Sequence, residues 1–419
     1  MMTLKDQVLK QAKEARGAAL QLALVSIKDK DAALKAMARA LTHSRGSIIR
    51  ANAKDVASGV KTGLSPALID RLTLTDGRIK EMANGILDII KLKDPVGEVL
   101  DSKVRPNGLR IDKIRVPIGV AGIIYESRPN VTSDCAALCI KSGNAVILKG
   151  GKEAIESNKA IYKVLKGALA GSKVPVEALQ LIESTERQAV VELLQLDNFV
   201  DIIVPRGGEG LIRFVAEHSL IPVVKHFKGV CHVYVGAKAD LRMAEEICFN
   251  AKVQRPGVCN AMEKMLIDEK VAAKFLPSMA ARFRGASVEL RGDEASRRIA
   301  GDIKKALVQD WTEEYLDLIL TVKIVKGVQA AVEHINTYGS RHSDAIVTQD
   351  KKEAAIFLKG VDSACVYVNA STRFTDGYEF GLGAEVGIST DKLHVRGPMG
   401  LEGLTSYKYQ IYGNGQVRT

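Results

Sequence analysis

The sequence is poor in aromatic residues and has no concentrated block of positive charge, which argues against a nucleic-acid-binding protein. Aromatic side chains make up 5% of the 419 residues, and the 60 Lys and Arg residues behind the formal net charge of +11 are spread along the whole chain. Surfaces that bind nucleic acid gather their positive charge and offer rings for base stacking. The excess of positive charge instead favours small anionic substrates such as phosphates and carboxylates.

Cysteine motifs and long apolar runs are missing as well. The six cysteines form no Cys-x-x-Cys pair, and no group of His and Cys residues has the spacing of metal ligands, so we predict no metal site. Cysteines without such pairing fit a reduced, cytoplasmic protein. No apolar run approaches the roughly 20 residues that cross a membrane, and the first helical segment carries Asp6 and Glu14, unlike a targeting peptide.

The length and the patterns that are present predict an α/β protein of at least two domains. Apolar residues recur at spacings of three and four in 4–24 and 31–42, and the first ninety or so residues are predicted to be helical. Next, Pro106-Asn107-Gly108 separates two segments that alternate charged and apolar residues, 101–105 and 109–115, which predicts a β-hairpin. A two-stranded ribbon is marginal alone, so we expect this hairpin to pack against another subunit.

After Pro117 the pattern predicts a parallel, doubly wound sheet, because apolar runs typical of buried strands alternate with helical segments. The predicted strands are 118–125, 145–148, 179–182 and 201–204, and the predicted helices include 132–141 and 153–170. No Gly-x-Gly-x-x-Gly fingerprint is present, but the glycine-rich turns 149–151 and 206–210 follow two of the strands. Turns of this kind bind phosphate at a helix N-terminus.

Cys259 lies in the most informative stretch, 253–260. A predicted helix, 241–251, leads into this stretch and a predicted strand, 262–267, leaves it. The thiol is therefore expected on a short turn where backbone N–H groups can converge on a bound oxygen. Arg255 lies four residues upstream, and a nearby cation favours the thiolate. This window alone leaves open an inert buried cysteine in a connecting loop.

Several stretches, in chain order, resemble the aldehyde dehydrogenase superfamily: 117–120, 123–130, 142–149, the cysteine stretch 253–260 and 313–315. Three narrower stretches resemble the γ-glutamyl phosphate reductases, also called glutamate-5-semialdehyde dehydrogenases: 333–344, 380–387 and 395–401. The resemblance covers essentially the whole chain. It implies an aldehyde-dehydrogenase-like α/β fold and an oxidoreductase of proline biosynthesis that reduces L-glutamyl 5-phosphate with NADPH. The products would be L-glutamate 5-semialdehyde and phosphate.

The resemblance also implies roles for single residues. Cys259 matches the nucleophile, which would form a thioacyl intermediate, and Asn130 matches the oxyanion-hole Asn, although a plain turn Asn remains an alternative. Lys149 matches a cofactor-binding Lys. NAD-preferring relatives carry Glu where this chain has Lys152, and a cation there favours the 2′-phosphate of NADPH, unless Lys152 is only a solvated lysine.

The remaining candidates match the superfamily less closely. Glu314 matches a contact to the nicotinamide ribose, with plain loop charge as the alternative, and Gly207 and Gly208 match the turn over the pyrophosphate loosely. Arg255 is a candidate for binding the leaving phosphate. Glu126 and Arg128 are weaker candidates for the α-amino and α-carboxylate groups of the substrate.

One departure from the superfamily concerns water. Hydrolytic aldehyde dehydrogenases carry a Glu that activates water, whereas 225–230 reads Lys-His-Phe-Lys-Gly-Val. This absence favours a phosphate-dependent reductase over a hydrolytic dehydrogenase, although His226 remains an alternative base. His334 and His342 are predicted to be structural or substrate-side residues. A reductase of another acyl phosphate and a non-catalytic protein of the same fold also remain as rivals.

The sequence predicts four parts. Residues 1–98 and 118–245 form an NADPH-binding domain, and residues 246–378 form a catalytic domain with Cys259. Residues 99–117 and 400–419 form an oligomerisation hairpin and a C-terminal arm, and residues 379–399 are a return segment to the cofactor domain. The hairpin and the arm are expected to pair with another subunit in a homodimer or a multiple of dimers. We also expect a transient contact with glutamate 5-kinase. We expect no binding to nucleic acid or to a membrane.

Overall fold

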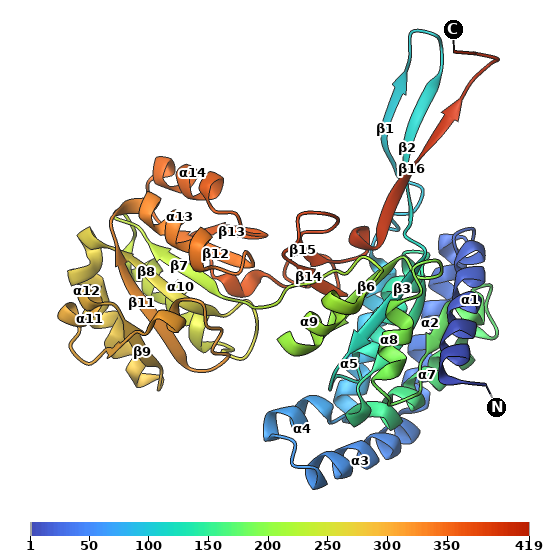
Figure 1. The fold of residues 1–419 in the computed structure, drawn as a ribbon, viewed down its shortest axis with the longest axis horizontal. Coiled ribbons are helices and arrows are strands. Elements are labelled where there is room, and N and C mark those ends of the chain that lie inside the picture. The colour runs from blue at the N-terminus through green and yellow to red at the C-terminus, as the bar shows by residue number, and fades with distance from the viewer. Residues whose placement is uncertain (1, 419) are drawn as a thin grey trace. The chain divides into compact units, whose positions relative to one another are not determined.

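A computed structural model describes residues 2–418 of the chain (Figure 1). The chain forms two compact units. Among the described residues, the first comprises 2–225, Gly381–Gly387 and 398–418, and the second comprises His226–Phe380 and Ile388–Gly397. No helix within residues 2–418 combines the length and the apolar character needed to cross a bilayer.

The first unit begins with five helices: α1 Leu4–Leu22, α2 Ile27–His43, α3 Arg45–Lys61, α4 Pro66–Leu72 and α5 Asp76–Lys91. Thr3, Ser26, Ser65 and Thr75 cap four of them, since each side chain accepts a backbone N–H from the first turn. The predicted helices 4–24 and 31–42 are confirmed by α1 and α2, and the second of these begins one turn earlier because Ser26 caps it.

A four-stranded parallel sheet forms the core of the first unit. Its strands are β3 Val120–Tyr125, β4 Ala145–Gly150, β5 Leu179–Leu181 and β6 Ile202–Arg206, in the order β5-β4-β3-β6. The helices that alternate with them are α6 Val131–Lys141, α7 Ile155–Leu169, α8 Gln188–Leu194 and α9 Glu209–His218. The strand order reverses between β3 and β6. At such a switch point the loops after the two strands diverge, which leaves room for a ligand at their carboxyl ends.

Three antiparallel strands form an arm that extends from the first unit (Figure 1). They are β1 Val99–Val104, β2 Arg110–Pro117 and β16 Thr405–Tyr412, in the order β1-β2-β16. The predicted hairpin is confirmed. The C-terminal strand pairs along the whole of β2, from Thr405 opposite Pro117 to Tyr412 opposite Arg110. The predicted C-terminal arm therefore pairs with the predicted hairpin of the same chain.

The second unit is built on a seven-stranded parallel sheet with the order β10-β9-β11-β8-β7-β12-β13. The strands are β7 Cys231–Val235, β8 Met262–Asp268, β9 Glu289–Gly292, β10 Lys304–Lys305, β11 Ile319–Val325, β12 Ser343–Val347 and β13 Cys365–Val368. Its helices are α10 Leu241–Val253, α11 Glu269–Gly285, α12 Glu294–Ile299, α13 Gly327–Tyr338 and α14 Lys351–Gly360. Two further short strands, β14 Gly387–Ser389 and β15 Gly397–Met399, pair with each other.

Both faces of this sheet are covered. Val233 and Val235 of β7 belong to one buried cluster with apolar residues of α10 and α11, whereas Tyr234 belongs to another with residues of α13 and α14. Successive side chains of a strand point to opposite faces, so the apolar run of β7 meets helices on both sides. A parallel sheet with both faces buried needs such continuous apolar strands, and its edges are then the places where polar groups can gather.

His334 of α13 makes the stability of the second unit depend on pH. It is 5% exposed and lies between Trp311, at a ring-centroid distance of 5.4 Å, and Tyr338, at 4.7 Å. Burial, reinforced by His232 and nearby lysines, lowers its pKa from 6.5 to about 3. Because the folded pKa lies below the unfolded one, the unfolded chain takes up a proton first as the pH falls, and stability is lost below about pH 6.5.

We therefore expect His334 to account for a loss of about 2 kcal/mol in the free energy of unfolding between pH 7 and pH 5. This loss is measured by urea unfolding of the wild type and of His334→Gln at both pH values. The free energy of unfolding of the variant should depend less on pH, because the variant lacks the titrating imidazole. His43, which is exposed at the end of α2, supplies the control His43→Gln. An equal pH dependence in all three proteins would contradict the assignment.

Candidate active site

Cys259 lies on the loop between α10 and β8, as the sequence predicts. It is partly exposed, whereas the other five cysteines are buried. Burial raises the pKa of Cys135 to about 12 and holds that of Cys231 and Cys139 well above the ordinary value. A thiol of this kind stays protonated and inert, so Cys259 is the cysteine best suited to act as a nucleophile.

The backbone on both sides of Cys259 is held tightly. A Cβ atom added to Gly229 would lie 1.9 Å from the carbonyl oxygen of Cys259, so only glycine allows these two backbones to approach. The Cys231 thiol donates to the same carbonyl at 3.2 Å. On the other side, Asn260 donates to the carbonyl of Thr375 at 2.8 Å, and Thr372 donates to the carbonyl of Asn260 at 2.7 Å. The thiol is thus presented from a fixed backbone.

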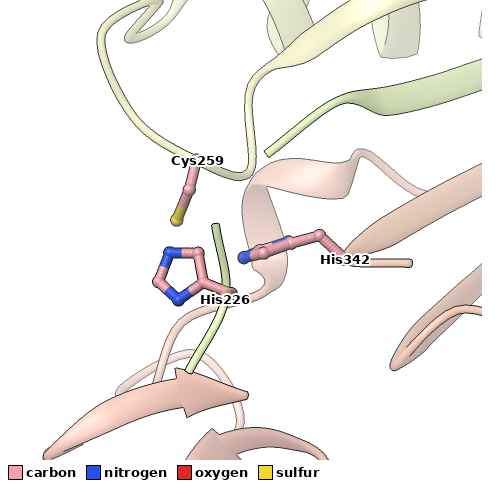
Figure 2. Close-up of side chains that lie close together, drawn as sticks. All are labelled: His226, Cys259 and His342. Atoms are coloured by element: carbon pink, nitrogen blue, oxygen red, sulfur yellow. The ribbon is translucent and has the colours of Figure 1, made fainter. Parts of the chain in front are cut away.

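Two histidines lie beside the thiol (Figure 2). The sulfur of Cys259 and one ring nitrogen each of His226 and His342 all lie within 4.8 Å of one another. The rings of the two histidines are 5.5 Å apart between centroids, at an angle of 66°. The Nδ1 atom of His226 bonds the backbone carbonyl of Ile388 at 2.9 Å, so that nitrogen is the protonated one, and Nε2 carries the lone pair.

The three side chains meet because of the strand order. His226 precedes β7, Cys259 precedes β8 and His342 directly precedes β12, and these strands are neighbours in the sheet. The amino ends of neighbouring parallel strands lie at one edge of the sheet. The sequence by itself indicates His226 only as an alternative base and His342 as a structural or substrate-side residue. The three positions are far apart in the sequence, so spacing gave no signal for the group.

Arginine residues add positive charge around the thiol. Arg373 donates to Gln254 at 2.8 Å and, in a close contact, to the side-chain oxygen of Asn260. Burial and the charge of Arg255 lower the pKa of Arg373, and the charge of Cys259 acts in the opposite direction. Arg255 itself is exposed. Sequence reasoning missed Arg373, because it follows β13, more than a hundred residues from the cysteine loop.

Glu314 is tied to the same backbone as Cys259. Its carboxylate accepts the N–H of Gly229 at 2.8 Å, and Gly229 is the residue that packs against the Cys259 carbonyl. The preceding carbonyl, that of Glu313, accepts the buried ammonium of Lys264 at 2.7 Å. Burial holds the pKa of Lys264 below its ordinary value, and the charge of Glu263 acts against that shift. The loop that carries Glu314 is therefore anchored to the interior of the second unit.

The remaining predicted site residues lie in the first unit. Asn130 occupies the N-cap position of α6 without a side-chain capping hydrogen bond, and its side-chain amide instead donates to Asp134 at 2.9 Å. Burial raises the pKa of Asp134 to about 6, and the hydrogen bonds from Asn130 and Ser133 act against that rise. One of the two amide N–H groups of Asn130 thus fixes the orientation of its side chain.

The carboxyl ends of β3, β4 and β6 bring together most of the predicted cofactor residues. Lys149 is buried, donates to the carbonyl of Gly150 at 2.9 Å and has its pKa lowered by burial. Lys152 is exposed at the start of the short 3₁₀ helix Lys152–Ala154. The turn after β6 is held by Glu126, whose carboxylate accepts the N–H of Gly208 at 3.0 Å.

The switch-point turn holds a carboxylate of the chain itself. A Cβ atom on Gly207 would lie 2.3 Å from the Glu126 carboxylate, and the Gly208 N–H already holds that carboxylate at the start of α9. The donor set, backbone N–H groups after β6 with Lys149 and Lys152 at the carboxyl end of β4, fits the phosphates of a dinucleotide. Arg128 is exposed in the loop after β3. The roles of Glu126 and Arg128 toward the substrate stay predictions.

Comparison with known proteins agrees with this description. Residues 2–299 match the aldehyde dehydrogenase family. The gamma-glutamyl phosphate reductase of Thermodesulfovibrio yellowstonii is 54% identical over 417 residues, with 100% of both chains covered. That of Clostridium beijerinckii is 53% identical over 413 residues, with 99% of this chain and 100% of the relative covered.

Solved structures extend the comparison. The crystal structure of gamma-glutamyl phosphate reductase from Thermotoga maritima superposes with a TM-score of 0.97 at 47% identity and covers 99% of this chain and 100% of its own. An acetylating aldehyde dehydrogenase from Geobacillus thermoglucosidasius shares the fold, with a TM-score of 0.70 at 18% identity over 99% of this chain and 98% of its own. The chain therefore belongs to the aldehyde dehydrogenase family and, within it, to the gamma-glutamyl phosphate reductases. The predicted fold class and family are confirmed.

Proposed function

We propose that this enzyme reduces L-glutamyl 5-phosphate with NADPH, in the second step of proline biosynthesis from glutamate. The products are L-glutamate 5-semialdehyde and phosphate. Relatives that carry the reductase name match the chain over its full length, which supports an oxidoreductase acting on glutamyl phosphate. The observation that carries the chemistry is Cys259, the single partly exposed thiol, with two imidazole rings at its sulfur.

The first step is the transfer of the acyl group to Cys259. The sulfur bonds to the γ-carbonyl carbon, the thiol proton passes to Nε2 of His226, and the bond from that carbon to the phosphate oxygen breaks. The hydrogen bond from Nδ1 to Ile388 supports this role, because it keeps the lone pair on Nε2. The guanidinium groups of Arg255 and Arg373 suit the leaving phosphate.

Two donors are proposed to stabilise the oxyanion that forms in each half of the reaction. They are the backbone N–H of Cys259 and the second amide N–H of Asn130. The bond from Asn130 to Asp134 supports this role, since it fixes the amide before substrate binds. A preorganised donor of this kind typically contributes about 3 kcal/mol to transition-state stabilisation.

The second step reduces the thioester and releases the aldehyde. When bound, NADPH supplies the hydride for the thioester carbonyl. The C–S bond of the hemithioacetal on Cys259 then breaks, and the sulfur recovers its proton from His226. We propose that Lys149, Lys152, Gly207 and Gly208 hold the phosphates of the cofactor and that Glu314 binds its nicotinamide ribose.

Lys152 is the residue proposed to select NADPH over NADH. Replacing it with Glu is expected to lower kcat/KM for NADPH about 10- to 100-fold, because a charge-assisted hydrogen bond contributes roughly 1.5 to 3 kcal/mol. The value for NADH should stay level or rise. Lys163→Glu, the same charge change at an exposed position of α7, is the control. Steady-state kinetics with both cofactors checks this, and an equal loss for both would contradict it.

The arm is proposed to join subunits. Two of its three strands, β1 and β16, expose large apolar side chains: Val99, Leu100, Val104, Tyr407, Tyr409, Ile411 and Tyr412. An arm of this composition is expected to be covered by a second copy of the chain, in a homodimer or a multiple of dimers that sedimentation would detect. We further propose a cytoplasmic location and a transient contact with glutamate 5-kinase, which makes the unstable substrate.

The reverse reaction tests the proposed function. The purified enzyme is given the semialdehyde and NADP⁺ with and without phosphate, and NADPH formation is followed by absorbance. We expect NADPH only when phosphate is present, because phosphate must attack the Cys259 thioester to release the acyl group. Equal NADPH formation without phosphate would mean that water accepts the acyl group, and the proposal would give way to a hydrolytic dehydrogenase.

A further inference from the structure

We infer that Cys259, His226 and His342 form a binding site for a divalent transition metal, represented by Zn²⁺, that blocks the nucleophile reversibly. One sulfur and two ring nitrogens lie within 4.8 Å of one another, and Figure 2 shows the three side chains close together, with the sulfur of Cys259 next to the ring of His226. The prediction that the chain has no metal site was based on sequence spacing. The spacing of residues along the sequence gives no sign of these three ligands, because they come together only through the strand order β8-β7-β12.

The geometry is close to that of a zinc site. Zinc bonds of about 2.0 Å to nitrogen and 2.3 Å to sulfur, arranged as a tetrahedron, separate ligand atoms by roughly 3.5 Å. The three atoms need to approach one another by little more than about 1 Å. Rotation of the partly exposed Cys259 and His226 side chains provides that movement, while the buried His342 remains in place. The fourth position is left to water.

The surroundings of the two histidines resemble those of metal ligands. A metal-binding histidine commonly donates its second ring N–H to a backbone carbonyl or another fixed group, which orients the ring. For His226 that group is the carbonyl of Ile388, at 2.9 Å from Nδ1. For His342 it is the hydroxyl of Ser343, at 2.9 Å from Nδ1, and this hydroxyl is in turn 2.6 Å from that of Thr375.

The donor atoms select the class of metal. A thiolate with two imidazoles suits Zn²⁺ and, more weakly, Co²⁺, whereas Mg²⁺ and Ca²⁺ require oxygen ligands. On binding, the Cys259 thiol loses its proton to solvent, the Zn–S bond forms and bound water leaves the metal, with no change of oxidation state. The sulfur can then neither attack a carbonyl nor be alkylated. The inferred metal binding does not depend on the proposed function, whereas inhibition of the reductase by the metal does.

Binding is tested on the whole enzyme after treatment with a chelator. Zn²⁺ is titrated by calorimetry, Co²⁺ is followed through its thiolate charge-transfer absorption, and alkylation of Cys259 by iodoacetamide is measured by peptide mass spectrometry. We expect one equivalent of Zn²⁺ to bind, to protect Cys259 from alkylation and to be removed by EDTA. Mg²⁺ should have no effect.

The variants decide whether all three side chains take part. His226→Gln and His342→Gln should each weaken Zn²⁺ binding at least tenfold and remove the protection, whereas His218→Gln, on α9 of the first unit, should behave as the wild type. His226 is partly exposed, so that variant is expected to fold even if the one at the buried His342 does not. Unchanged Zn²⁺ affinity in His226→Gln, or no protection in the wild type, would overturn the inference.

These readouts separate this inference from the proposed function. Protection of Cys259 without any phosphate-dependent activity would keep the metal site and reject the reductase. Phosphate-dependent activity that Zn²⁺ leaves unchanged, without protection of Cys259, would keep the reductase and reject the metal site.

Discussion

Replacing Cys259 with Ala is expected to lower the phosphate-dependent reduction of NADP⁺ by at least about 10⁴-fold, because loss of a catalytic nucleophile typically costs that much or more. The stability of the fold should change little, since the side chain is partly exposed and lies on a loop. Stopped assays of the purified variant measure the residual rate, and a urea denaturation curve checks the fold.

A second cysteine provides the matched control for this result. Cys139 lies in α6, is buried, and has its pKa held well above the ordinary value by burial, so its thiol cannot serve as a nucleophile. Cys139→Ala should keep most of the activity. The assignment of Cys259 fails if its variant retains a tenth of the wild-type rate, or if the Cys139 variant loses activity to the same extent without unfolding.

Replacing His226 with Gln is expected to lower kcat about 10²- to 10⁴-fold, the usual contribution of a positioned general base, with little change in KM. Gln can still donate to the carbonyl of Ile388, but it cannot accept the thiol proton. The acylation step should slow together with kcat. A rapid-quench measurement of phosphate release from L-glutamyl 5-phosphate reports this step directly.

A second variant distinguishes proton transfer from a structural effect. His226→Ala leaves space beside Cys259, and imidazole added in solution should restore part of its rate by accepting the proton in place of the missing ring. His218→Gln should match the wild type in both assays. Full activity in His226→Gln, or no restoration of His226→Ala at any imidazole concentration, would mean that the thiol is activated in another way.

Local patterns in the sequence predicted much of the architecture. The Pro106-Asn107-Gly108 turn predicted the hairpin of β1 and β2, and the apolar runs after Pro117 predicted β3, β4 and β6. The stretch around Cys259 predicted a helix, a loop and a strand, and α10 and β8 confirm its two flanks. These features depend on turn chemistry and on the period of apolar residues, which neighbouring residues along the chain determine.

The sequence by itself determined which residues can do chemistry: an accessible cysteine on a loop, lysines after a strand and glycines in a turn. The tertiary structure alone decided what surrounds them. His226, His342 and Arg373 meet the cysteine loop because β12, β7 and β8 are neighbours and β13 follows β12, and β16 pairs along β2 from the far end of the chain. Strand order and long-range pairing depend on packing between distant segments, which no local pattern records.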